Sequence, residues 1–334
     1  MVTMADVARL SGVSSSTVSH VLNETRHVDA ATRTRVEDAV ATLGYRRNTA
    51  ARTLAGGSSH TIGLAISGLT NPYFGPLLQA IERRVTESGY VLVLGDTHDD
   101  SVMEQRVIDS LLARSVDGLI IAPSSGFLEH SAPRIDATET PTVLIDRSME
   151  WKSDQITPEN RASTRALTEH LISHGHRRIA AITGLPGLHS STERLAGYRD
   201  AMATAGLEID DSIVVSGESN ADVSQTVVAR LLARAEPPTA LLTLNNAMTI
   251  GALRAASRAE LSIPQDLALA AYDDFEWSDL FQPGLTAAAQ DVARMGAEAV
   301  DLLYARIDGA NGPSVHRIID TTFHRRTSCG CSPS

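Results

Sequence analysis

The sequence contains few cysteines and no long apolar run, and each shortage excludes a class of protein. Its two cysteines, Cys329 and Cys331, are separated by a single residue, which is too close for an ordinary disulfide and too few ligands for a zinc site. No stretch approaches the roughly 18 consecutive apolar residues of a membrane span, and the N-terminus lacks the residue order of a signal peptide. We therefore expect a cytoplasmic protein with no metal, no cofactor and no membrane partner.

Catalytic motifs are missing as well. No predicted strand is followed by the G-x-G-x-x-G turn that binds dinucleotides, and residues 184–187 (Gly-Leu-Pro-Gly) do not replace it. No Ser/His/Asp arrangement and no metal-ligand spacing stands out either. These absences argue against an enzyme.

The charge is unevenly distributed along the chain. The 334 residues are 43% hydrophobic, enough for two or three domains with ordinary cores, and the net charge is −11. Residues 1–57 hold seven arginines against five acidic residues, a net of +2, which leaves −13 on the remainder. A small basic module joined to an acidic body is typical of specific DNA binding with little nonspecific adhesion.

Residues 3–23 predict a helix, a tight turn and a second helix. In the first helix one buried face is spaced i, i+3, i+4, i+7: Met4, Val7, Ala8 and Ser11. Gly12 permits the turn, and Ser14 is placed to cap the second helix. The inward face of that helix comprises Val18, Val21 and Leu22. The short polar side chains left outside suit a DNA major groove, although a small helical bundle that never contacts DNA would share part of the pattern.

A third helix and a linker follow. Asp29 can cap a helix that presents Val36, Ala39, Val40 and Leu43 on one face, and Gly44 ends it. Residues 46–54 predict a short helix, and residues 55–59 (Ala-Gly-Gly-Ser-Ser) predict a flexible joint. A headpiece with its own small core therefore precedes the rest of the chain.

From Thr61 onward, short apolar runs alternate with longer amphipathic stretches, which predicts parallel β-sheets covered by helices. A first series has strands at 62–67, 91–95, 118–122 and 142–146, with helices near 73–88, 101–114 and 127–136. A second series has strands at 178–183, 213–216, 240–245 and 267–273, with helices near 161–175, 190–205, 222–234 and 246–260. Two doubly wound α/β lobes follow, and a ligand is expected where the carboxyl ends of the strands face a cleft.

Many short motifs, in order, resemble the LacI/GalR (lactose-repressor) family of bacterial transcription regulators over nearly the whole chain. In the headpiece they are Asp6-Val7-Ala8, Gly12-Val13-Ser14, Thr17-Val18-Ser19 and Val21-Leu22-Asn23. In the remainder they are Asn71-Pro72-Tyr73-Phe74, residues 116–120 (VDGLI), 175–179 (GHRRI), 193–198 (ERLAGY), 272–274 (YDD) and Leu285-Thr286. The headpiece is especially similar to the purine-repressor branch, through residues 17–21 and Asn23 with Thr25-Arg26.

The resemblance implies a division of the chain into a helix-turn-helix headpiece at 1–46, a hinge helix and linker at 47–60, and a periplasmic-binding-protein-like effector core at 61–327. Within the core, lobe one would comprise about 61–160 plus 291–320 and lobe two about 161–290, with a tail at 328–334. The chain would cross between lobes near Asn160, near Gln290 and near residue 320.

For DNA binding, the resemblance implies that Ser15, Ser16 and His20 read bases. Serine can donate or accept and so tolerates several bases, whereas His20 can donate to guanine N7 or O6. The rest of the implied DNA-binding set is Thr3 and Arg26 at phosphates, Thr17 and Asn23 beside the backbone, the capping Ser14, and Leu54 as a minor-groove wedge with Ala51 beside it. A solvated His20 and a linker role for Leu54 are the alternatives, and Arg47 replaces the proline that many members have.

For effector binding, the resemblance places two aromatic side chains, Tyr73 and Phe74, at a helix start where a sugar ring would stack. The polar effector residues would be Asp146, Arg194, Asn245, Asp273 and Gln290, mostly at strand ends or helix starts. Ser219 replaces a stacking tryptophan of the lactose repressor, and Trp277 is the predicted substitute. The alternatives are a local Asp146–Arg147 ion pair, ordinary loop polarity at Asp273 and simple packing of Trp277.

The predicted function is a sequence-specific DNA-binding transcriptional regulator, a repressor controlled by a small carbohydrate-like effector between the two core lobes. A recognition helix this small reads few base pairs, so a homodimer on a pseudo-palindromic operator of double-stranded DNA is expected. The alternative is a sugar-binding protein without DNA function.

Overall fold

The chain divides into two units at Ser59, and the computed structural model describes residues 2–23, 26–45, 58–69 and 71–332. The first unit comprises residues 1–59 and the second residues 60–334. In the described part of the chain, no helix is long and apolar enough to cross a membrane.

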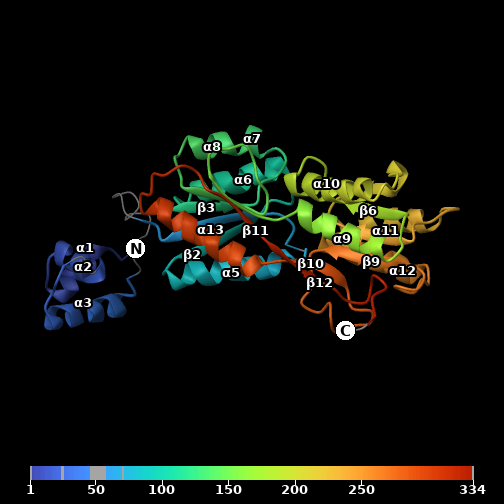
Figure 1. Ribbon diagram of the computed structural model, residues 1–334. Coiled ribbons are helices and arrows are strands. Elements are labelled where there is room, and N and C mark those ends of the chain that lie inside the picture. The colour runs from blue at the N-terminus through green and yellow to red at the C-terminus, as the bar shows by residue number, and fades with distance from the viewer. Residues whose placement is uncertain (1, 24–25, 46–57, 70, 333–334) are drawn as a thin grey trace. The chain divides into compact units, whose positions relative to one another are not determined.

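The N-terminal unit contains α1 (Met4–Ser11), α2 (Ser15–Asn23) and α3 (Ala30–Leu43), which form the predicted helix-turn-helix headpiece (Figure 1). Each helix begins at a side-chain cap: the amides of Asp6, Thr17 and Thr32 donate to Thr3, Ser14 and Asp29 at 3.4, 3.2 and 2.9 Å. Glycine in the left-handed region ends α1 and α3, with φ +68° at Gly12 and +60° at Gly44. The core of the headpiece is small: Val7, Ala8, Val18, Val21, Val36 and Ala39.

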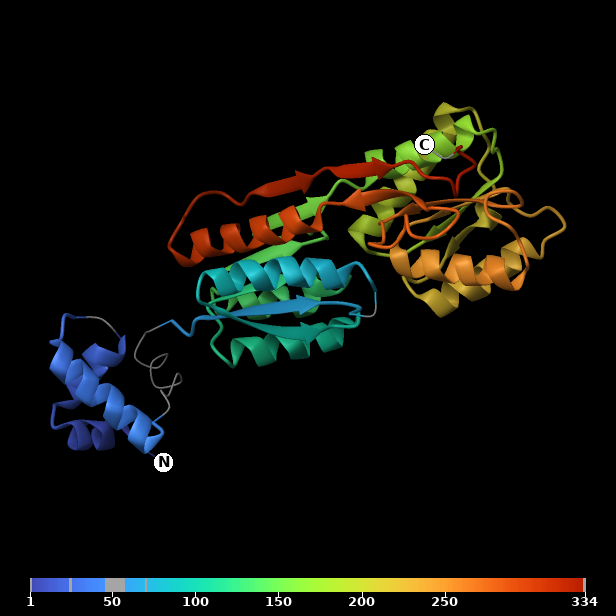
Figure 2. The same cartoon turned by 90° about the horizontal axis from the view of Figure 1, so that it is seen from below.

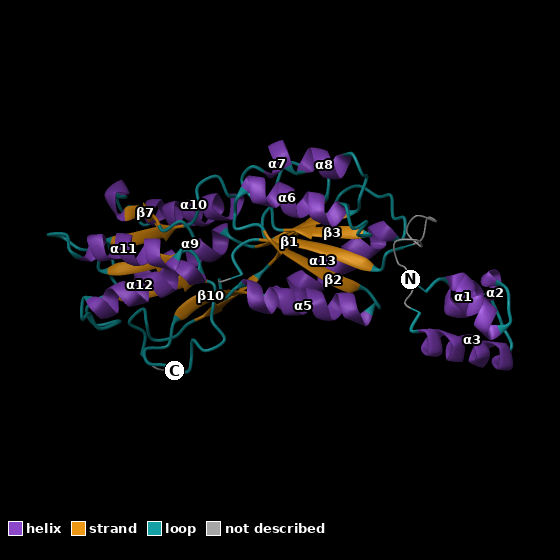
Figure 3. Ribbon diagram, turned by 180° about the vertical axis from the view of Figure 1, so that it is seen from behind, coloured by secondary structure: helices purple, strands orange, loops and turns teal. Residues whose placement is uncertain are grey.

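The first lobe of the larger unit is built on a six-stranded sheet, ordered β11-β5-β4-β3-β1-β2, in which all pairings are parallel. Its strands are β1 (Thr61–Ile66), β2 (Val91–Asp96), β3 (Gly118–Ile121), β4 (Thr142–Ile145), β5 (Asp154–Pro158) and β11 (His316–Ile319). Its helices are α5 (Phe74–Glu87), α6 (Ser101–Leu112), α7 (Phe127–His130), α8 (Ala132–Asp136) and α13 (Val292–Ile307). Helices α5 and α13 pack together on one face, and α6 to α8 cover the other (Figure 3).

The second lobe repeats this plan with the order β12-β10-β9-β8-β6-β7, in which only the β10–β12 pairing is antiparallel. Its strands are β6 (Ile179–Thr183), β7 (Val214–Ser216), β8 (Ala240–Thr243), β9 (Ala268–Tyr272), β10 (Thr286–Gln290) and β12 (Thr321–His324). Its helices are α9 (Arg161–Ser173), α10 (His189–Thr204), α11 (Ala221–Leu232) and α12 (Asn246–Arg258), with a 3₁₀ turn at Asp211–Ile213. Helix α9 packs against α10, and α11 against α12.

The chain changes lobe three times: between β5 and α9, between β10 and α13, and at Asp320 between β11 and β12. Figure 2 shows the last two strands following one another from the first lobe into the second. Helix α13 and β11, although late in the sequence, therefore complete the first lobe. Three connections of this kind therefore join the two lobes.

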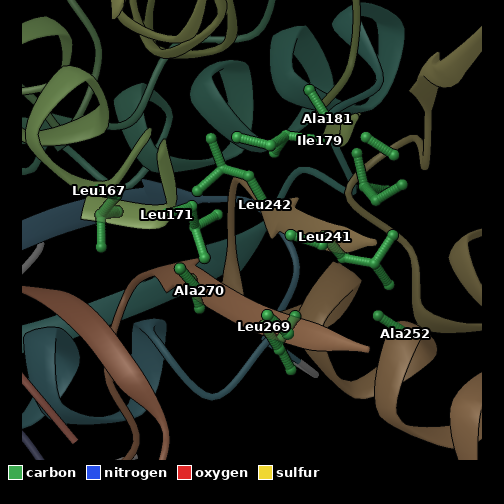
Figure 4. Close-up of a cluster of buried hydrophobic side chains, with 14 of the residues drawn as sticks. Leu167, Leu171, Ile179, Ala181, Leu241, Leu242, Ala252, Leu269 and Ala270 are labelled. Carbon is green, nitrogen blue, oxygen red and sulfur yellow. The ribbon is translucent and has the colours of Figure 1, made fainter. Parts of the chain in front are cut away.

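The core of the second lobe combines leucines and alanines from both the helices and the strands (Figure 4). Leu167, Leu242 and Ala270 are fully buried. Each leucine buried in this way contributes about 1.5–3 kcal/mol of transfer free energy.

Several expectations need correction. The helix expected over 127–136 is two helices, broken at Ser131, whose hydroxyl donates to buried Glu104 at 2.8 Å. Periodicity did not identify β5, β10, β11 or β12. In the segment expected to be a tail, 328–334, Ser328 and Cys329 are 2% and 0% exposed, and Ser328 Oγ donates to the Leu269 carbonyl at 2.7 Å.

Candidate functional site

A cleft lies at the carboxyl ends of both sheets in the larger unit. It encloses about 530 Å³ of empty space, part of it open to solvent. Residues that directly follow β1, β4, β6, β8 and β9 line it. Seven of the eight predicted effector residues are among the lining side chains: Tyr73, Phe74, Asp146, Arg194, Asn245, Asp273 and Gln290.

The two aspartates occupy equivalent places in the two lobes. Asp146 follows β4 and Asp273 follows β9, each the fourth strand from the β2 or β7 edge, and each has a positive φ, +70° and +76°. Both carboxylates are buried, at 6% and 3% residue exposure. Burial raises the pKa of Asp273, and the charge of Arg194 and a 2.6 Å hydrogen bond from Gln290 Nε2 partly offset this effect. The cleft therefore contains a carboxylate from each lobe in the same strand-end position.

The side chain of Arg194, near the start of α10, is held in place by two hydrogen bonds and by a cation–π contact with one aromatic ring. Its Nε donates to Asn160 Oδ1 and its Nη1 to the Leu244 carbonyl, both at 2.7 Å, and its guanidinium carbon lies 3.7 Å from the centre of the Tyr272 ring. Among the described residues no acceptor is hydrogen-bonded to Nη2, although the residue is only 6% exposed. A donor is thus left for a ligand.

Gly197 sets the position of α10 and hence of Arg194. A Cβ at Gly197 would lie 2.1 Å from the backbone oxygen of Arg161 at the start of α9, a distance that real structures do not show. Only glycine lets the two helices approach this closely. The glycine of the ERLAGY motif therefore has a packing role that serves the arginine three residues before it.

Arg147 also lines the cleft, although the sequence suggested for it only an ion pair with Asp146. It forms a two-pronged ion pair with Asp99 and donates to the Pro123 carbonyl at 3.1 Å and to Ser67 Oγ at 3.3 Å. Its Nε lies 3.4 Å from Asp146 Oδ2 without hydrogen-bond geometry. Burial alone would lower the pKa of Arg147, but the charges of Asp99 and Asp146 outweigh burial and raise it. Asp146 and Arg147 therefore form the local ion pair that was the alternative to effector binding, and both residues also line the cleft.

Unpaired polar atoms mark the same cleft. The Tyr73 hydroxyl, Arg147 Nε and Gln290 Oε1 are buried and have no hydrogen-bond partner among the described residues. Burial, followed by the charge of Asp146, raises the pKa of Tyr73. Such atoms cost free energy unless a ligand or water satisfies them. They point to a ligand with several hydroxyl or amide groups.

Three of the predicted effector residues lie at the starts of two helices. Tyr73 and Phe74 lie at the start of α5, with their rings edge to face at 5.0 Å. Asn245 caps α12, with its Oδ1 accepting from the Met248 amide at 2.9 Å.

Trp277, the predicted substitute aromatic wall, is not among the residues that line this cleft. Its ring stacks on Phe275 at 4.4 Å, is 43% exposed, and lines an adjoining pocket that shares three lining residues with the cleft. Three other lining residues were not predicted as effector contacts. Ligands of parallel sheets bind beyond the carboxyl ends of the strands, and this rule could have found all three: Ser67 after β1, Asp99 after β2, and Ser219 after β7.

In the headpiece, a run of polar side chains covers the start of α2. Ser14, Ser15 and Ser16 are exposed, and Ser14 Oγ lies 2.8 Å from Ser16 Oγ and 2.9 Å from Thr17 Oγ1. Thr3 and Arg26 are exposed and His20 is half-buried. Asn23 is the last residue of α2. The predicted minor-groove residues, Ala51 and Leu54, lie outside the described residues.

Comparisons with known proteins agree with this architecture. Residues 3–48 match the family described as bacterial regulatory proteins, lacI family, and residues 168–329 match a periplasmic binding protein-like domain. The chain is 38% identical over 308 residues to the ribose operon repressor of Escherichia coli (strain K12), covering 92% of this chain and 93% of that protein. It is 34% identical to the HTH-type transcriptional repressor PurR of Glaesserella parasuis serovar 5 (strain SH0165), covering 93% and 92%.

Solved structures resemble it over nearly their whole length. A lac repressor dimer bound to operator and the anti-inducer ONPF has a TM-score of 0.85 at 30% identity, covering 98% of this chain and 99% of that one. A complex of the transcriptional regulator CelR with cellobiose has a TM-score of 0.73 at 28% identity, covering 98% and 100%. The chain therefore belongs to the LacI family of bacterial regulatory proteins.

Proposed function

We propose that this protein is a cytoplasmic transcriptional repressor whose affinity for operator DNA is set by a small, uncharged sugar bound in the cleft. One observation carries the proposal: seven side chains predicted to bind an effector, drawn from both lobes, converge on one cleft in a chain with a helix-turn-helix headpiece. The similar ribose operon repressor and the CelR–cellobiose complex support a sugar as the effector class.

The charges of the cleft favour a neutral polyol over a phosphorylated sugar. Three carboxylates, on Asp99, Asp146 and Asp273, face two guanidinium groups, on Arg147 and Arg194. Asp99 and Arg147 already pair, so a phosphate would meet two buried carboxylates and one available cation. Sugar hydroxyls instead can donate to those carboxylates and accept from Arg194, while Tyr73 and Phe74 cover the apolar C–H face.

Cleft residues also contact two of the three segments that connect the lobes. Arg194 donates to Asn160, and the Tyr272 hydroxyl donates to the Glu159 carbonyl at 2.6 Å, both on the first connection. Gln290, which binds Asp273, precedes the second connection. A ligand that rearranges these contacts changes how the lobes are oriented, which provides a route from the cleft to DNA affinity through a population shift.

For DNA binding, we propose that the exposed start of α2 enters the major groove of each half of a pseudo-palindromic operator bound by a homodimer. Ser15, Ser16 and His20 would meet base edges. The remaining proposed contacts are to phosphates, the backbone or the minor groove: Thr3, Ser14, Thr17, Asn23, Arg26, Ala51 and Leu54.

Fluorescence anisotropy on labelled DNA from upstream of the protein's own gene tests the proposal. We expect specific binding at low salt, and a change of about 5- to 150-fold in affinity with one uncharged pentose or hexose but not with its phosphate ester. His20→Ala should weaken specific DNA binding and leave sugar binding measured by calorimetry intact, whereas Arg194→Ala should do the reverse. Sugar binding without DNA binding to any probe would favour the sugar-binding protein without DNA function.

A further inference from the structure

Four side chains with metal-binding donor atoms meet in the second lobe, outside the cleft. His170 lies in the last turn of α9 and His174 is the residue that directly follows the helix, while Cys329 and Cys331 lie in the last described segment of the chain. Their donor atoms are all within 4.8 Å of one another. The spacing of the cysteines alone predicts no metal site, because the other two ligands are more than 150 residues away in the sequence.

The distances fit a tetrahedral ion. His170 Nε2 is 3.1 Å from Cys329 Sγ and 3.4 Å from Cys331 Sγ, and His174 Nε2 is 3.2 Å from Cys331 Sγ. With Zn–S near 2.3 Å and Zn–N near 2.0 Å, the edge of a tetrahedron between nitrogen and sulfur is about 3.5 Å. These three nitrogen–sulfur distances therefore need to lengthen by only a few tenths of an ångström to match that edge.

The surroundings support a site with fixed ligands. Cys329 is fully buried, and Thr286 Oγ1 on β10 donates a hydrogen bond to its sulfur at 3.1 Å, which would stabilise a thiolate that binds a metal. The ring of Phe323 packs edge to face on His170 at 5.3 Å. Gly330, at φ +95°, allows the turn that brings both sulfurs to the same side of the segment.

We propose that His170, His174, Cys329 and Cys331 bind one Zn²⁺ ion, which ties the C-terminal segment to α9. Two thiolates and two neutral imidazoles balance the charge of a divalent ion, and this donor set with tetrahedral geometry is typical of zinc. Because all four positions are filled by protein ligands, the site is structural rather than catalytic. The ion joins the last strand of the second lobe to the helix that begins beside Asn160.

Metal analysis of the full-length protein tests the proposal. The protein is purified under reducing conditions, with any histidine tag removed, and its zinc is counted by mass spectrometry. We expect about one Zn²⁺ per chain, and Co²⁺ substitution should give the thiolate charge-transfer and tetrahedral d–d bands of an S₂N₂ site. A protein that takes up no Zn²⁺ and shows no such Co²⁺ spectrum overturns the assignment.

Substitutions at the two more accessible ligands avoid disturbing the buried core. Cys331→Ser and His174→Gln should each weaken Zn²⁺ binding more than about 100-fold in competition with a chromophoric chelator, since even second-shell changes cost about 10- to 100-fold. His176→Gln is the matched control, because His176 instead contacts Thr239 Oγ1 at 3.0 Å. Wild-type Zn²⁺ affinity in either ligand variant, or its loss in the control, contradicts the proposed ligand set.

The effect on folding gives a second readout. A chelator should lower the thermal unfolding midpoint of the wild-type protein and leave that of Cys331→Ser unchanged, because that variant has no bound ion to lose. Equal responses of the two proteins to the chelator would refute a structural role for the ion.

Discussion

Replacing Arg194 by lysine keeps the positive charge of the cleft but removes the forked geometry of its donors. The guanidinium donates from two nitrogens, at 2.7 Å each, to Asn160 Oδ1 and the Leu244 carbonyl, two acceptors that a single ammonium nitrogen cannot reach in the same way. Losing one charge-assisted hydrogen bond in this buried position should lower the free energy of unfolding by about 1.5–3 kcal/mol. The lysine also lacks the Nη2 donor, so effector affinity should fall at least about tenfold, or 1.4 kcal/mol.

Chemical unfolding followed by tryptophan fluorescence measures the first effect, because both tryptophans, Trp151 and Trp277, lie in the effector-binding unit. Calorimetry measures the second. The matched control is Arg161→Lys: Arg161 pairs with Asp200 at 2.7 Å, but its side chain is 51% exposed, so this change should destabilise the protein less than Arg194→Lys does. If Arg194→Lys bound the effector as tightly as the wild type, Arg194 would not be a ligand contact.

Three further predictions concern other parts of the molecule. Burial raises the pKa of Asp273, so its favourable contribution to stability is present below the unfolded-state pKa and lost as the pH rises through the folded-state pKa. Asp273→Asn should therefore raise the thermal midpoint at neutral pH and lose that advantage in acid, while weakening effector binding; a gain independent of pH would contradict the charge argument. Trp277→Ala should leave effector affinity within about twofold, since its ring packs on Phe275 outside the cleft, and calorimetry would show otherwise if it were a ligand. Ser14→Ala removes the acceptor for the Thr17 amide and should destabilise the headpiece by about 1 kcal/mol, measured by circular dichroism on the headpiece transition with the tryptophan transition unchanged.

Sequence periodicity predicted the elements with a clear apolar face and missed those without one. In the headpiece helices and the central strands of both sheets, apolar residues recur with a clear pattern, so these elements could be predicted from the sequence. Strands β11 and β12 are short and expose most of their side chains, and β10 is mostly alanine, so none of them carries a distinct pattern. The family resemblance, and not periodicity, indicated that the lobes are discontinuous.

The cleft residues were predictable to the extent that they follow strands. Asp146, Asn245 and Asp273 end strands or follow them closely, where parallel sheets place their ligands. The prediction for Trp277 rests only on its aromatic ring as a substitute for the tryptophan that Ser219 replaces, and in the structure that ring stacks on Phe275. The four candidate zinc ligands could not be grouped from sequence, because only the fold brings α9 to the C-terminal segment.

The order of the strands also decides when each lobe can be completed during synthesis. The first lobe begins at Thr61 but contains α13 and β11, so its sheet and one of its helical layers stay unfinished until residue 319 has left the ribosome. The second lobe in turn needs β12 and the segment around Ser328. A nascent chain that ends before residue 319 therefore has no finished lobe.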